Sequence, residues 1–264
     1  MKKQLVIATL LLISGDCHAV NSQVQALTEQ EMVARGREGY LNRCSGCHGE
    51  KADGQGPASP MLNPKPRNLV EGAFKFRSTP SGNLPTVSDL LRTINQGIPG
   101  TAMPPFQEVG DAEKMAIVAY IRSLRPDFKE SKPETLAMTI AEPPKEIFES
   151  KASLLKAAAI GKKHFAAACV SCHGTSGRGD GPSAEILVDS YDQPIRPANL
   201  SKLFIKSGKS AKDIFKVMTT GLDGSPMPAF SDILKENQRW EIVAYIFYLR
   251  GITAGIYNEK DELP

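Results

Sequence analysis

The stretch CSGCHG occupies residues 44–49, and its pattern returns as CVSCHG at residues 169–174. The similarity extends well beyond these six residues. The run IVAYI at residues 117–121 is repeated letter for letter at residues 242–246. A repeat this long is a duplicated domain and not the short unit of a solenoid.

The composition is that of an ordinary folded protein. The chain has 264 residues, of which 41% are hydrophobic and 23% charged, with a formal net charge of +3. These values exclude a mainly disordered chain. The 32 Lys and Arg residues barely outnumber the 29 Asp and Glu residues, which argues against a nucleic-acid partner. With 22 Gly and 19 Pro, much of the chain should form turns around a small core.

The domain boundaries follow from the repeat and from proline. We predict one domain at residues 20–130, a linker at residues 131–147 and a second domain at residues 148–264. Pro133, Pro143 and Pro144 punctuate this linker, so it cannot form one continuous helix.

Inside each copy the periodicity is helical, and period-2 strand patterns are lacking. We therefore predict an all-α fold with few or no strands. Two equivalent helices should end at Gly97 and Gly221, because Gly commonly follows the last helical turn. Helix starts share a Ser or Thr followed three residues later by an acidic residue: Thr28–Glu31, Thr86–Asp89 and Ser210–Asp213.

The pattern Cys-x-x-Cys-His is the attachment signature of a c-type haem. Two thiols one helical turn apart can form thioethers with the two vinyl groups of one porphyrin edge, and the adjacent His can bind the iron through Nε2. We expect two covalently bound haem c groups. The residues concerned are Cys44, Cys47 and His48 in the first copy and Cys169, Cys172 and His173 in the second.

Other uses of these cysteines fit less well. A zinc site needs four ligands close together, and the two Cys pairs are far apart in the chain. A disulfide or a redox dithiol within each pair would not require the His that follows both of them.

Met103 and Met227 are the candidate sixth ligands. Each lies in a Gly-x-x-Met-Pro loop just before the last helix of its copy. A thioether is a soft, neutral ligand that favours Fe(II) and raises the reduction potential. Met218 is a nearby rival in the second copy, but its counterpart in the first copy is Ile94, which cannot bind iron.

Over residues 25–255 the chain resembles two class I cytochrome c domains in tandem, as in a dihaem periplasmic cytochrome. The resemblance implies that the first and last helices of each domain cross at a contact between Gly and aromatic residues. The residues at the matching positions are Gly36, Tyr40 and Tyr120 in the first copy and Gly161, Phe165 and Tyr245 in the second.

The resemblance also implies that a prolyl carbonyl accepts a hydrogen bond from the iron-binding His. The matching positions are Pro57 and Pro182, each in a Gly-Pro pair after its Cys-x-x-Cys-His motif. Asn68 and Asn199 also occupy equivalent positions. Each could bind a haem propionate or cap a turn, and the sequence does not separate these two roles.

Residues 1–19 read as a secretory signal peptide, with Lys2 and Lys3 before a short apolar stretch. Cleavage near Ala19 would place the protein in the periplasm without a membrane span. A lipidated Cys17 is the alternative.

These features predict an electron carrier that moves single electrons between a donor and an acceptor redox protein, either alone or as a subunit of a larger respiratory complex. The alternative is an enzyme, a dihaem peroxidase, which needs an open haem and acid–base residues. His164 is the only His outside the signal and the two motifs, so we expect no enzyme. A cluster of lysines is a candidate docking surface for an acidic partner: Lys202, Lys206, Lys209, Lys212 and Lys216.

Overall fold

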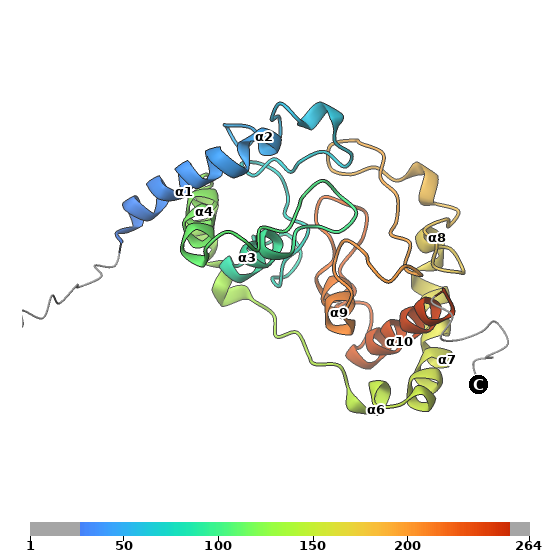
Figure 1. Cartoon of the computed structure of the whole chain (residues 1–264). Helices are drawn as coiled ribbons and strands as arrows, with labels where there is room; N and C mark the ends of the chain where they lie inside the picture. The colour runs from blue at the N-terminus through green and yellow to red at the C-terminus, as the bar shows by residue number, and fades with distance from the viewer. Residues whose placement is uncertain (1–26, 254–264) are drawn as a thin grey trace, which may run out of the picture.

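The computed structural model describes residues 27–253 (Figure 1). The predicted signal peptide lies outside the described residues. The longer helices fall into two equivalent sets. Domain 1 contains α1 (Glu29–Arg43), α3 (Val87–Gln96) and α4 (Asp111–Ser123), and domain 2 contains α7 (Lys151–Ala168), α9 (Ala211–Thr220) and α10 (Glu236–Thr253).

Short helical turns complete the fold. Each Cys-x-x-Cys-His motif forms a four-residue helix, α2 (Ser45–His48) or α8 (Val170–His173), and is followed by a 3₁₀ turn, η1 (Ser59–Met61) or η3 (Ala184–Ile186). Between the domains the chain is broken, as its prolines predict, into α5 (Asp127–Ser131), η2 (Pro133–Leu136) and α6 (Lys145–Phe148).

The prediction of an all-α fold is confirmed within the described residues. Only two isolated β-bridges occur there, between Val188 and Pro194 and between Ile205 and Gly208. All three predicted capping boxes form, and α3 and α9 end at Gly97 and Gly221 as expected. Within residues 27–253, no helix is long and apolar enough to cross a membrane.

The first and last helices of domain 1 cross at Gly36. A Cβ at this position would lie 1.8 Å from the carbonyl oxygen of Ala116 in α4, so only Gly permits this approach. The rings of Tyr40 and Tyr120 pack beside the crossing with their centroids 5.2 Å apart. The Tyr40 hydroxyl donates a 2.8 Å hydrogen bond to the carbonyl of Gly49, just after the Cys-x-x-Cys-His motif.

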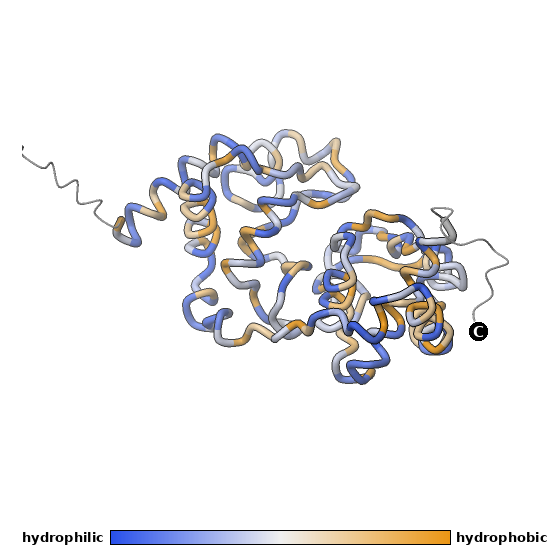
Figure 2. Tube along the Cα trace, turned by 60° about the horizontal axis from the view of Figure 1, so that its bottom comes forward, coloured by the Kyte–Doolittle hydropathy of each residue, from blue (hydrophilic) through white to orange (hydrophobic). Residues whose placement is uncertain are grey.

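Domain 2 repeats this crossing between α7 and α10. A Cβ at Gly161 would lie 1.9 Å from the carbonyl oxygen of Glu241, and the rings of Phe165 and Tyr245 are again 5.2 Å apart. Trp240 is buried and stacks on Phe215 of α9 at 3.9 Å. In Figure 2 hydrophobic segments run through both lobes. The core of domain 2 draws many of its buried residues from α10.

The domains meet through α3 and α9, which lie near the centre of the molecule in Figure 1. Arg92 of α3 forms a 2.6 Å ion pair with Asp213 of α9. Lys216 of α9 lies 3.6 Å from Asp89 of α3. Arg92 and Lys216 occupy equivalent positions in the two copies, as do the two aspartates. The two ion pairs are therefore reciprocal, as in an interface with approximate twofold symmetry.

This interface corrects part of the predicted lysine cluster. Lys216 lies at the domain contact with only 12% of its side chain exposed, so it is not available for docking. Lys212 pairs with Glu142 of the linker. The other three lysines, Lys202, Lys206 and Lys209, are exposed, and their role in docking stays a prediction.

Candidate functional site

The Cys-x-x-Cys-His motif begins where α1 ends. Cys44 is the C-cap residue of α1, and the next helical turn, α2, carries Cys47 and His48. The backbone N–H of His48 donates to the carbonyl of Cys44 at 2.9 Å, which closes one helical turn over the motif. Domain 2 has the same turn, with a 2.8 Å bond from His173 to Cys169. Both motifs therefore hold two thiols and an imidazole on one turn.

The chemistry of the cysteines separates the alternatives that the sequence left open. Among the described residues all four cysteines are free of disulfides. Burial raises the pKa of Cys44 to about 11 and that of Cys169 to about 12. A redox dithiol typically has a thiol with a lowered pKa, so these raised values disfavour that use. Within residues 27–253 no cluster of three His, Cys, Asp or Glu side chains is arranged to hold a metal ion.

The two histidines are held by backbone carbonyls. His48 Nδ1 lies 2.9 Å from the carbonyl oxygen of Arg67, and His173 Nδ1 lies 3.0 Å from that of Ala198. A carbonyl oxygen only accepts, so Nδ1 carries the proton in each ring. Burial lowers the pKa of both histidines, which favours the neutral ring. The Nε2 lone pair is then available to a metal.

The prediction that the carbonyls of Pro57 and Pro182 accept these bonds is therefore wrong. The Gly-Pro segments approach the motif with N–H groups: Gly56 donates to the carbonyl of Cys47 at 3.1 Å. Gly181 makes the same bond to Cys172 at 3.2 Å. With the segment in that orientation, the acceptor for the imidazole comes from a later part of the chain.

The true acceptors sit at equivalent positions of a repeated motif. Arg67 and Ala198 are the variable residues of Pro-x-Asn-Leu at residues 66–69 and 197–200. The repetition of this motif in both copies was the sequence feature that could have pointed to these acceptors. A backbone acceptor puts no demand on side-chain type, so neither residue stands out in the sequence.

Asn68 and Asn199 cap turns in this same motif. The Oδ1 of Asn68 accepts from the N–H of Val70 at 2.9 Å, and that of Asn199 accepts from the N–H of Ser201 at 3.0 Å. These bonds support the turn that presents the carbonyl to the histidine. Of the two roles that the sequence left open, the structure shows the turn-capping one.

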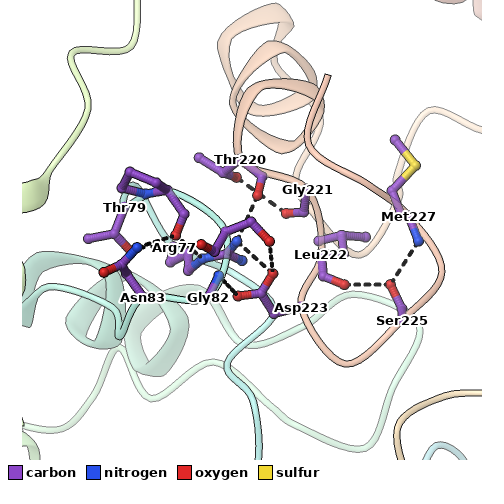
Figure 3. A network of polar contacts seen from close by, with 12 residues as sticks. Arg77, Thr79, Gly82, Asn83, Thr220, Gly221, Leu222, Asp223, Ser225 and Met227 are labelled. Carbon is purple, nitrogen blue, oxygen red and sulfur yellow. Dashed lines mark hydrogen bonds and ion pairs between the residues drawn. The ribbon is translucent and has the colours of Figure 1, made fainter. Parts of the chain in front are cut away.

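The two methionine loops have the same internal hydrogen bonds. In domain 1 the N–H of Ile98 donates to the carbonyl of Met103 at 3.0 Å. In domain 2 the N–H of Leu222 donates to the carbonyl of Met227, also at 3.0 Å. The Met103 N–H donates to the Thr101 hydroxyl at 3.1 Å. In domain 2 the Met227 N–H donates to the Ser225 hydroxyl at 3.4 Å (Figure 3). Both methionines are half-buried.

The remaining candidates have structural roles. Met218 is 5% exposed and packs in the core of domain 2, so it is a core residue. His164 Nε2 lies 3.1 Å from a carboxylate oxygen of Glu241, which engages the nitrogen that a metal would need.

The residues present in each domain suit a c-type haem. Each domain offers two unpaired thiols on one turn, an imidazole whose Nδ1 is engaged and whose Nε2 is free, and one methionine in a hydrogen-bonded loop. This set of soft and nitrogen donors matches haem iron ligation.

Comparison with known proteins agrees with this chemistry. The family model for cytochrome c matches the chain twice, at residues 33–125 and 158–250. The chain is 28% identical, over 83% of its length, to the cytochrome bc1 complex cytochrome c subunit of Corynebacterium efficiens, and spans 63% of that protein. It is also 28% identical, over 87% of its length, to the corresponding subunit of Corynebacterium diphtheriae, and spans 72% of it. The chain thus covers less than two thirds of the first of these relatives.

A solved structure is more similar. A chain of the reducing HAO-like protein complex of Kuenenia stuttgartiensis is 36% identical and superposes with a TM-score of 0.75. The match covers 81% of this chain and 95% of that one.

Proposed function

The chain belongs to the cytochrome c family, and on that premise we propose that it is a dihaem periplasmic carrier of single electrons between redox proteins. The observation that carries the proposal is the duplicated donor set. Each domain has a Cys-x-x-Cys-His turn with its histidine fixed by a backbone carbonyl, and each has the same hydrogen-bonded methionine loop.

The proposed attachment and ligand residues are the same in both domains. The cysteines would form the thioethers, and His Nε2 and Met Sδ would bind the iron. In domain 1 these are Cys44, Cys47, His48 and Met103, and in domain 2 Cys169, Cys172, His173 and Met227. When bound, haem c supplies an iron that alternates between the ferric and ferrous states, which is one-electron chemistry.

The protein's own part is to hold the ligands. The carbonyls of Arg67 and Ala198 fix the tautomer and orientation of the imidazoles. The hydroxyls of Thr101 and Ser225 order the methionine loops. With a protein ligand from both His and Met, the iron would have no position for a substrate, and this arrangement would favour electron transfer over peroxidase chemistry.

We propose that the partners are redox proteins and that the chain works as a subunit of a larger respiratory assembly. The relatives in both Corynebacterium species are named as subunits of the cytochrome bc1 complex, and the structural neighbour belongs to a named protein complex. These names support an assembled setting without identifying the donor or the acceptor.

The test is the far-red methionine–iron charge-transfer band of the ferric protein, measured per covalently bound haem. The intact protein should show one band equivalent for each of two haems. Met103→Ala and Met227→Ala should each remove one equivalent while both haems stay attached. Each should also lower the potential of its own haem by on the order of 0.1 V, within the roughly 0.8 V range that axial ligands set.

Met218→Leu is the matched control, since Met218 is a core residue of the same domain. A single band equivalent in the intact protein would mean an open or differently ligated haem and would favour the peroxidase alternative. A band that survives both methionine variants would refute the ligand assignment.

A further inference from the structure

Arg77 crosses from domain 1 into the methionine loop of domain 2. Its guanidinium donates at 2.7 Å to the carbonyl of Thr220, the last residue of α9. The same guanidinium nitrogen forms a 2.7 Å ion pair with Asp223 (Figure 3). The Arg77 side chain has no exposed surface, and that of Asp223 is 17% exposed. This is a buried, charge-assisted contact between two domains.

Asp223 receives more than this one bond. The Ser81 hydroxyl donates to its Oδ1 at 2.7 Å, and the Gly82 N–H donates to its Oδ2 at 2.8 Å. All three donors come from one segment of domain 1. A buried carboxylate with its partners in place is stable, whereas removal of the arginine would leave a poorly solvated charge. Asp223 is therefore firmly anchored to domain 1.

The anchor lies inside the loop that carries Met227. The loop starts at Gly221, and its two ends are joined by the bond between Leu222 and Met227. Asp223 is the residue directly after Leu222, so a shift of Asp223 would displace the pair that positions Met227. In domain 1 the equivalent position is Pro99, which has no side-chain acceptor.

A second contact flanks the same loop. The N–H of Ser190 donates to the carbonyl of Gly224 at 3.3 Å. Arg67 of domain 1 lies over the ring of Tyr191, with its guanidinium carbon 5.5 Å from the centroid. A Cβ at Gly224 would be 3.3 Å from an Arg67 nitrogen, so this loop has domain 1 side chains on both sides of Asp223.

We propose that Arg77 is a positioning residue through which domain 1 sets the strength of the bond between Met227 and the iron of domain 2. This inference rests on the proposed ligation by Met227. A thioether is a weak, neutral ligand, so its occupancy depends on how rigidly its loop is held. Arg77 acts through Asp223 and the loop backbone, since its bonds to domain 2 go to the carbonyl of Thr220 and the carboxylate of Asp223.

The experiment measures how easily imidazole displaces each methionine from the ferric protein. In a Met103→Ala background the far-red charge-transfer band reports Met227 alone. Adding Arg77→Gln should lower the imidazole concentration that removes half of this band by at least tenfold. In a Met227→Ala background, which reports Met103 alone, Arg77→Gln should leave the titration unchanged.

Arg92→Gln is the matched control. It also removes an ion pair between the domains, but the hydrogen bonds of Arg92 go to Ser207 and Asp213, which lie outside the Met227 loop. We expect less than a twofold change in the Met227 titration. Equal effects of Arg77→Gln and Arg92→Gln would show that general domain contact matters and would overturn the proposal, as would no effect of Arg77→Gln.

The proposed function is tested separately within the same series. If the Met103→Ala protein shows no band at all, the ligand assignment of Met227 fails before Arg77 is changed. If the band is present and Arg77→Gln does not alter its titration, only the positioning role fails. Asp223→Asn provides a second variant that keeps the bond from Arg77 to Thr220, and it should shift the titration in the same direction by a smaller factor.

Discussion

The two domains are alike where they would hold a haem and different where they touch each other. Their helix crossings, histidine carbonyl bonds and methionine-loop hydrogen bonds match pair by pair. Their lengths differ in two places. From Leu69 to Thr86 domain 1 is seven residues longer than domain 2 from Leu200 to Ser210. From Pro182 to Pro197 domain 2 is six residues longer than its counterpart.

Both extra segments lie at the contact between the domains. The first contains Arg77, Ser81 and Gly82, which donate hydrogen bonds to the carboxylate of Asp223. The second contains Ser190 and Tyr191, which contact Gly224 and Arg67. The duplicated core thus keeps the same hydrogen bonds in both copies, while the segments unique to one copy add contacts to the loop of domain 2 that domain 1 lacks at Pro99. The contact between α3 and α9 differs from these segments, because its two ion pairs use equivalent residues of both copies.

The largest effect should come from the helix crossings that the domains share. Gly36→Ala and Gly161→Ala each place a Cβ within 2 Å of a backbone carbonyl oxygen, and the helices must separate. We expect each variant to lose at least about 3 kcal/mol of unfolding free energy in its own domain. Denaturant unfolding followed by helical circular dichroism measures this.

Gly46→Ser is the control for the glycine variants. A Cβ at Gly46 meets no atom within 4 Å, and the equivalent residue of domain 2 is already Ser171. Its unfolding midpoint should stay near that of the parent. A Gly36→Ala protein as stable as the parent would contradict the close crossing.

An effect of intermediate size on the unfolding free energy should distinguish the two equivalent aspartates, Asp89 and Asp213. Asp89 is 5% exposed and accepts bonds from the Ser78 N–H at 2.7 Å and the Ser78 hydroxyl at 2.8 Å in addition to its capping box. Asp213 is 24% exposed and has Arg92 as its main partner outside its own cap. We expect Asp89→Ala to cost about 2–3 kcal/mol and Asp213→Ala about 1–2 kcal/mol.

The same denaturant titration checks the aspartates. Both variants lose one capping box and one contact between domains, so the difference between them isolates the Ser78 bonds. Ser78→Ala should therefore reduce the gap between the two costs. Equal costs for Asp89→Ala and Asp213→Ala would show that the Ser78 bonds add nothing.

The smallest effect should come from a tyrosine that only domain 1 uses in this way. Tyr40 donates to the Gly49 carbonyl at 2.8 Å, whereas domain 2 has Phe165 at that position and a longer 3.4 Å contact from Tyr245 to Thr175. Tyr40→Phe should cost domain 1 about 1 kcal/mol, a typical buried hydrogen bond. Tyr245→Phe should cost less than half as much, by the same thermal or denaturant measurement, and a larger loss in Tyr245→Phe would reverse this reading.

Local patterns in the sequence predicted most of the fold. The capping boxes from Thr28, Thr86 and Ser210 form because Ser or Thr and an acidic residue three positions later meet on one turn. The glycine contact between the first and last helices followed from the resemblance to class I cytochromes c, and the structure confirms it. The acceptors of the histidine bonds were predicted wrongly, because that choice depends on the path of a loop between distant residues.

What the sequence determined by itself is whatever is encoded in short spacing and in repetition: two copies, their helices, the Cys-x-x-Cys-His turns and the methionine loops. The tertiary structure alone decided that Arg67 and Ala198 face the histidines and that Lys216 lies at an interface. It also decided that Arg77 is buried against Asp223. Arg77 and Asp223 are far apart in the chain and neither residue is repeated in the other copy, so only the packing of one domain on the other brings them together.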